Sequence, residues 1–138
     1  MTPAASSAGR VIARRAAALL GAWCLAAGAS ADHPRSLAPA DLVERLARAQ
    51  APAMLDVRTP AEFAAGHLPG AVNIPVDQLG ERLGELASLR DRELLVYCET
   101  GRRAGVAVQG LGRAGFAHLR LLDGHMRRWR GEARALAR

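Results

Sequence analysis

The stretch that decides the fold is ELLVYCETGRR, residues 93–103. Its first five residues form a short, mostly apolar run, which is typical of a strand buried on both faces of a sheet. A polar loop follows directly, and the segment 103–114 then repeats apolar residues at helical spacing up to Gly115. A strand that runs through a tight loop into a helix is the building unit of a parallel sheet.

The sequence on either side repeats this alternation of apolar runs and amphipathic segments. We expect helices over 39–49, 60–65, 77–86 and 124–137, and strands over 53–57, within 68–75 and over 118–122. Strands that alternate with helices predict an α/β fold, with a central parallel sheet and helices on both faces. A length of 138 residues allows one such domain and not two.

The N-terminal residues 1–31 have the three-part pattern of a secretory signal peptide. Arg10, Arg14 and Arg15 form a positive head, residues 16–27 are apolar, and Ala29-Ser30-Ala31 supplies small residues at the spacing of a cleavage site. Spanning a bilayer takes about 20 residues, so an uncleaved membrane anchor is the less favoured alternative. We expect export to the periplasm, with no stable membrane insertion after cleavage. The Sec and twin-arginine routes both stay open.

Removal of this leader would leave a linker over 32–36 and one domain over 37–138. The mature chain would carry 16 arginines, no lysine and 13 acidic residues, a net charge of +3. Without a basic stripe and interleaved aromatic residues, nucleic-acid binding is not expected. Cys98 would be the one remaining cysteine, so no internal disulfide can form. The four histidines show no ligand spacing, and no metal site is predicted.

Cys98 follows the most hydrophobic strand and precedes a helix, a position where open α/β sheets bind their ligands. A loop wrapping from strand to helix turns successive backbone N–H groups inward, and the helix N-terminus adds a partial positive charge. Such surroundings stabilise a thiolate and would also accept an anionic sulfur donor. Arg102 and Arg103 would strengthen this cradle, while Gly101 lets the backbone curl without a steric penalty.

Several segments together resemble the rhodanese family. The leading signature is carried by LDVRTPAEF at 55–63, GHLPGA at 66–71 and NIP at 73–75. The active-site loop is carried by VYCETGRR at 96–103, and the closing segment by Gly115-Phe116, residues 121–124 and Trp129. The resemblance spans nearly the whole mature chain in the right order. With its export leader, the protein looks like the small single-domain periplasmic rhodaneses of bacteria.

The resemblance implies a sulfurtransferase that needs no cofactor. Cys98 would attack a sulfane sulfur, as in thiosulfate, and become a persulfide, from which a small thiol or cyanide acceptor removes the sulfur in a ping-pong cycle. The loop amides would bind the donor and the persulfide anion, which makes Glu99, Thr100, Gly101, Arg102 and Arg103 the predicted substrate-binding residues. Asp56 and Arg58 are predicted to support the loop by hydrogen bonds. Protein partners are not predicted.

The chain departs from the family pattern in two places. Ala104 stands where rhodaneses often have serine, and Asp123-Gly124 stands where a glycine pair is usual, so Asp123 is expected to cap the last helix. Glu99 adds negative charge beside the nucleophile and is expected to weaken attraction for thiosulfate. A place near the pocket stays open for His125, although a lone histidine is more typical of a surface or helix-cap position. Trp129 is interpreted as a core residue.

Two other functions stay open beside enzymatic sulfur transfer. Ala104 and Glu99 are compatible with a low-turnover carrier of sulfane sulfur, or with a partner-binding module that keeps the fold. Phosphatases of related fold need a loop one residue longer, with arginine at the sixth place after the cysteine. That place holds Ala104, so phosphoester hydrolysis is disfavoured.

Overall fold

A computed structural model describes residues 34–138. The predicted signal peptide, residues 1–31, and the first residues of the predicted linker lie outside the described residues. Between residues 34 and 138, no helix combines the length and the apolar character needed to cross a bilayer.

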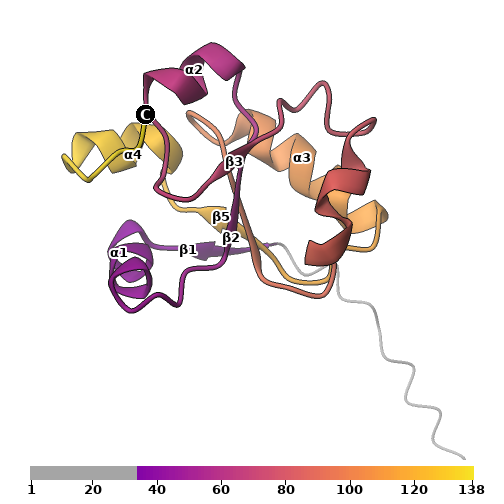
Figure 1. Cartoon of the computed structure of the whole chain (residues 1–138), viewed down its shortest axis with the longest axis horizontal. Coiled ribbons are helices and arrows are strands. Elements are labelled where there is room, and N and C mark those ends of the chain that lie inside the picture. Colours follow the sequence, from indigo (N-terminus) through magenta and orange to yellow (C-terminus); the bar gives the residue numbers. More distant parts are fainter. Residues whose placement is uncertain (1–33) are drawn as a thin grey trace, which may run out of the picture. The chain divides into compact units, whose positions relative to one another are not determined.

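The described chain is built around a five-stranded sheet in the order β1-β5-β4-β2-β3 (Figure 1). Every pair of neighbouring strands is parallel, which confirms the predicted sheet. The strands are β1 (Arg35–Leu37), β2 (Ala53–Asp56), β3 (Val72–Asn73), β4 (Leu94–Tyr97) and β5 (Leu119–Leu122). In this order β4 lies at the centre, so the loop that follows it opens at the middle of the sheet's carboxyl edge.

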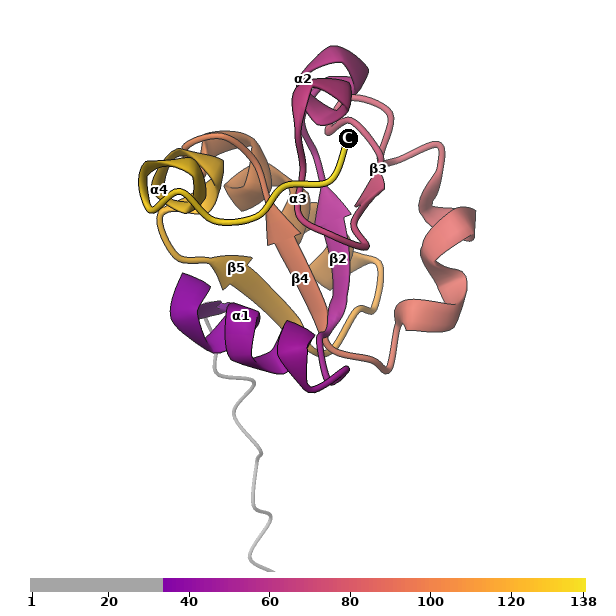
Figure 2. The same ribbon diagram turned by 60° about the vertical axis from the view of Figure 1, so that its left-hand side comes forward.

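Both faces of β4 are buried, as its apolar sequence predicts. Leu94 and Val96 belong to one core cluster, whereas Leu95 and Tyr97 belong to a second cluster on the opposite face. The first cluster includes residues of α3 (Arg102–Arg113) and η1 (Leu83–Leu89), and the second includes residues of α1 (Pro39–Ala47) and α4 (His125–Gly131). Figure 2 shows these helices on opposite sides of the sheet, with α2 (Pro60–Ala65) beyond its carboxyl edge.

The helix predicted over 77–86 is wrong. That segment forms turns, followed by the 3₁₀ helix η1 over Leu83–Leu89. Gly80 and Gly84 interrupt it, and each glycine inside an α-helix costs about 0.5–1 kcal/mol relative to alanine. The tighter winding still brings Leu86 into the core, at 2% exposure.

The ends of the domain also differ from expectation. β1 begins at Arg35, inside the predicted linker, because Arg35 and Ser36 pair with β5 as an edge strand while Leu37 enters the core. The last helix ends at Gly131 rather than near 137, and the C-terminal segment turns back to pair with His67.

Candidate active site

Cys98 lies at the carboxyl end of β4, and its side chain is buried, with 1% exposure. The backbone N–H of Gly101 donates to the Cys98 Sγ at 3.0 Å. Gly101 has φ +111°, a conformation that favours glycine, and it is the N-cap of α3. A pocket of about 370 Å³ opens beside the thiol and is lined by Val76, Cys98, Thr100, Arg102, Arg103 and Val106. The predicted nucleophile therefore lies at the wall of a small pocket, in contact with an inward-facing amide.

The first amides of α4 fix the orientation of the loop. The N–H of Met126 donates to the carbonyl of Cys98, and the N–H of Arg127 donates to the carbonyl of Glu99, both at 3.1 Å. In a trans peptide the carbonyl and the N–H point in opposite directions. The N–H groups of Glu99 and Thr100 are therefore turned away from α4, as expected for an anion cradle.

Arg103 lines the pocket, but its charge is already paired with a carboxylate. Its guanidinium forms a paired contact with the Glu62 carboxylate of α2, at 2.7 and 2.8 Å. The hydrogen bond from Arg103 lowers the pKa of Glu62 to about 2, and hydrogen bonds from Thr59 contribute. The hydrogen bond to Glu62 likewise raises the pKa of Arg103, and the nearby Cys98 side chain adds to this rise. Arg102 lines the same pocket and forms no ion pair with any residue in 34–138.

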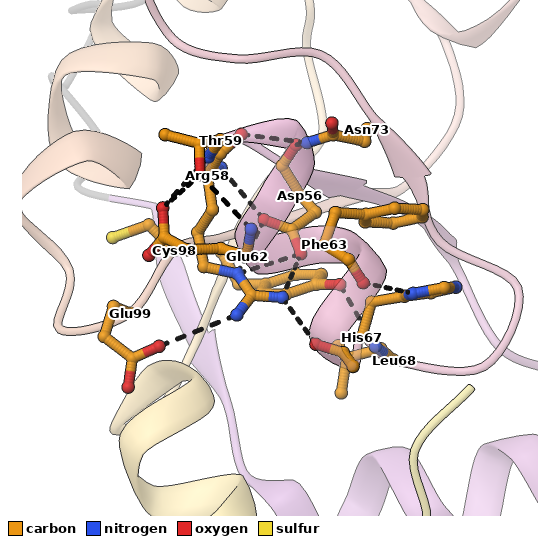
Figure 3. Close-up of polar contacts among 12 residues, drawn as sticks. Asp56, Arg58, Thr59, Glu62, Phe63, His67, Leu68, Asn73, Cys98 and Glu99 are labelled. Carbon is orange, nitrogen blue, oxygen red and sulfur yellow. Dashed lines mark hydrogen bonds and ion pairs between the residues drawn. The ribbon is translucent and has the colours of Figure 1, made fainter. Parts of the chain in front are cut away.

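Asp56 and Arg58 form a buried ion pair behind the loop, with 0% and 1% exposure (Figure 3). Burial disfavours the Arg58 cation, but the hydrogen bond and charge of Asp56 outweigh this effect and raise the pKa of Arg58. The guanidinium also donates to the carbonyl of Gly66 at 2.8 Å and lies 3.6 Å from the Glu99 carboxylate. Arg58 thus hydrogen-bonds the loop at Gly66 and reaches the Cys98 loop through its ion pair with Glu99, and the supporting role of the pair stays a prediction.

Glu99 is not an isolated negative charge. Its carboxylate contacts Arg58 on one side and pairs with Arg130 of α4 on the other. These two cations offset the repulsion between Glu99 and an anionic donor that the sequence suggested. The effect of Glu99 on donor binding stays a prediction.

His125 lies at this site, a place that the sequence left open although it favoured a surface or helix-cap position. It is buried, with 8% exposure, and its Nδ1 accepts the backbone N–H of Cys98 at 3.3 Å. Burial lowers the pKa of His125, while the charge of Asp123 opposes this shift. The available signal was topological, because residues just after β5 meet residues just after β4 at the same edge of a parallel sheet.

The turn before α4 also corrects two expectations. Gly124, with φ +68°, is the N-cap of α4, and it is followed by His125 with φ +52°. The two consecutive left-handed residues, which suit a glycine pair, are therefore Gly124 and His125 rather than Asp123 and Gly124. Asp123 does not cap α4, because no side chain forms a capping hydrogen bond at the start of this helix. The Asp123 carboxylate forms an ion pair with Arg128 instead.

Residues 38–132 match the model of the rhodanese-like domain family. A sulfurtransferase of Allochromatium vinosum is 33% identical over 88 residues, which is 64% of this chain and 80% of that protein. The thiosulfate sulfurtransferase PspE of Escherichia coli is 34% identical over 65 residues, 47% of this chain and 62% of that protein. Against an uncharacterised protein of Bacillus subtilis, 38% identical over 82 residues, the match is 59% of this chain and 64% of that relative's length.

Among solved structures, a rhodanese-related protein of Thermoplasma volcanium is 32% identical and superposes with a TM-score of 0.64. The match covers 75% of this chain and 97% of that one. The solved structure supports the same fold, and the family model matches most of the domain. The chain therefore belongs to the rhodanese-like domain family, and sulfurtransferases are among the relatives that it resembles.

Proposed function

We propose that this chain is a sulfurtransferase that takes the sulfane sulfur of thiosulfate, or of a similar small anionic donor, onto Cys98. The Cys98 thiolate attacks the outer sulfur of thiosulfate, the S–S bond of the donor breaks, and sulfite leaves with the bonding electrons. A thiolate or cyanide acceptor then attacks the outer sulfur of the Cys98 persulfide. The acceptor leaves as a persulfide or as thiocyanate, and the Cys98 thiolate is restored.

One observation carries this proposal, namely the contact between the Gly101 N–H and the Cys98 Sγ. A backbone amide aimed at sulfur favours an anion there, whether thiolate or persulfide. The α4 amides that bind the loop carbonyls also turn the N–H groups of Glu99 and Thr100 away from α4. The name of the Escherichia coli relative, a thiosulfate sulfurtransferase, supports thiosulfate as the donor to test first.

The shape of the loop does not favour phosphoester chemistry. The sixth position after Cys98 is Ala104, which is fully buried at 0% exposure and cannot donate to a phosphate. The polar lining of the pocket of about 370 Å³ includes Thr100, Arg102 and Arg103. Its apolar walls are Val76 and Val106. These features suit a small anion whose reacting atom is sulfur.

Intact-mass spectrometry of the purified chain after incubation with thiosulfate tests the proposal. We expect the mass to rise by one sulfur atom and to return to its starting value when cyanide is added. The Cys98→Ser variant should show no gain. A protein that gains no sulfur would refute the proposal. Sulfur loading with very slow steady-state formation of thiocyanate would instead identify a carrier.

We further propose that residues 1–31 direct export to the periplasm and are then removed. The pattern of positive head, apolar run and small residues supports this assignment. Fractionation of expressing cells should place the protein in the periplasm with a mass that begins at Asp32. A full-length protein retained in the cytoplasm would contradict the assignment.

A further inference from the structure

His125 is a buried imidazole at the reactive loop that the proposed reaction leaves without a role. It has φ +52°, and only two other non-glycine residues in 34–138 have a positive φ. A residue with a β-carbon is disfavoured in this conformation, although histidine tolerates it better than most. Strained backbone that persists next to a reactive group is a reason to look for a function.

The imidazole lies against two residues of the loop, Cys98 and Gly101. Its Nδ1 accepts the N–H of Cys98, the first loop residue, at 3.3 Å. Its Nε2 lies 2.8 Å from the place that a β-carbon on Gly101 would occupy. The ring therefore fills the space between the nucleophile's own amide and the residue whose amide contacts the Sγ.

The contact at Nδ1 also fixes the protonation state of the ring. A nitrogen that accepts an N–H carries no proton, so the proton of the neutral ring is on Nε2. Among charged neighbours, Asp123 favours the cation, whereas burial favours the neutral ring and lowers the pKa of His125. The Glu99 carboxylate on the loop is engaged by Arg58 and Arg130. Protonation at Nδ1 would set two donors against each other at the Cys98 amide.

We propose that His125 is a positioning residue that holds the Cys98 loop in its sulfur-accepting conformation only while the imidazole is neutral. The ring withdraws the Cys98 amide from the anion cradle and supports Gly101, so that the Gly101 N–H meets the Sγ. A proton on Nδ1 breaks the first contact and releases the loop. This role rests on the proposed sulfur transfer, but the loop movement can be measured without it.

Two substitutions at position 125 distinguish the loss of the hydrogen-bond acceptor from the loss of a side chain that can be protonated. Asparagine tolerates the left-handed conformation and offers a carboxamide oxygen that can accept the Cys98 N–H, but it does not titrate. Glycine keeps the backbone and removes the acceptor. His125→Asn should therefore preserve the loop at every pH, and His125→Gly should release it. His118 is exposed just before β5, and His118→Asn serves as the matched control.

The first measurement follows the backbone amide signals at positions 98 and 101 by NMR between pH 5 and 8. It uses the Cys98→Ser background, so that no thiol titrates. We expect both signals to move with pH in this background and with His118→Asn added, and to stay fixed with His125→Asn. Signals that still move in the His125→Asn protein would overturn the inference, whether or not the chain transfers sulfur.

The second measurement is the single-turnover rate of sulfur loading from thiosulfate over the same pH range. Below the pKa of His125, the rate should fall about ten times more steeply per pH unit in the wild-type protein than in His125→Asn, because one proton no longer matters in the variant. At pH 8, His125→Gly should load at least tenfold more slowly, while His125→Asn stays within about threefold of wild type. Wild-type loading by His125→Gly with an unchanged pH profile would overturn the proposal.

Discussion

The Asp56–Arg58 pair should be the polar contact whose loss destabilises the domain most. Asp56 accepts the backbone N–H of Arg58 at 2.9 Å and contacts its guanidinium at 2.6 to 3.0 Å. In the Asp56→Asn variant the guanidinium would remain buried, with 1% exposure, without a carboxylate beside it. Removing one partner of a buried ion pair costs about 3–5 kcal/mol, mainly because the other charge stays uncompensated.

The lower part of that range applies here. Asparagine keeps one oxygen that can accept from Arg58, and the Glu99 carboxylate lies 3.6 Å from the guanidinium. We therefore expect a loss of about 3 kcal/mol, a large fraction of the 5–15 kcal/mol that stabilises a typical domain. The matched control is Glu85→Gln, because Glu85 forms an exposed pair with Arg82. Such an exposed pair contributes little to stability, because solvent screens its charges.

Urea unfolding followed by tryptophan fluorescence measures the difference, since Trp129 is buried at 1% exposure. With a slope of about 1–3 kcal/mol per molar urea, a loss of 3 kcal/mol moves the midpoint down by about 1–3 M. The control should move it by less than half of that shift. Equal midpoint shifts for Asp56→Asn and Glu85→Gln would refute the idea that a buried, uncompensated guanidinium dominates the cost.

Two further predictions concern the loop. Gly101→Ala should abolish sulfur loading and lower the urea midpoint, because the new β-carbon would lie 2.8 Å from His125 Nε2 at φ +111°. Adding His125→Gly should recover part of the lost stability, and strictly additive effects would show that no clash occurs. Glu62→Gln should lower the KM for thiosulfate several-fold at low salt, since Arg103 loses its carboxylate, and an unchanged KM would argue against this. The Glu62→Gln substitution should also destabilise the protein by up to about 1 kcal/mol above pH 4.5. This difference should fade as the pH falls through about 2, where wild-type Glu62 is protonated.

The central part of the fold was predictable because its signal is local. The apolar run of β4 is buried on both faces, and the cysteine that follows directly is brought by the strand itself to the sheet's carboxyl edge. Likewise, Gly115 ends α3 with φ +90°, as its position after the apolar spacing indicated. Where one local signal stood without a competing one, as at β4, the structure agrees with the expectation.

Where two local signals competed, the prediction over 77–86 was wrong. The leucines recur at helical spacing, but Gly80 and Gly84 weaken an α-helix in the same stretch. A 3₁₀ helix over Leu83–Leu89 buries Leu86 without requiring an α-helix through either glycine. Hydrophobic spacing fixes which residues enter the core, but it does not fix the winding that takes them there.

The site's electrostatics depend on residues distant in sequence. Arg103 looked like a free cation because its partner, Glu62, lies 41 residues earlier on α2. Glu99 looked like an isolated anion because Arg130 is 31 residues later. Each charge reaches its partner only through the packing of elements at the sheet's carboxyl edge. The net charge on the rim therefore could not be read from the loop sequence alone.

The reactive loop cannot take its form from residues 98–103 alone. Its first two carbonyls need the amides of Met126 and Arg127, and the Cys98 amide needs His125. All three partners belong to the first turn of α4, whose own leading N–H groups would otherwise lack acceptors. The loop carbonyls thus accept hydrogen bonds from the first amides of α4, and these hydrogen bonds in turn fix the conformation of the loop. A change that loosens the docking of α4 should therefore reduce the reactivity of Cys98 before it unfolds the sheet.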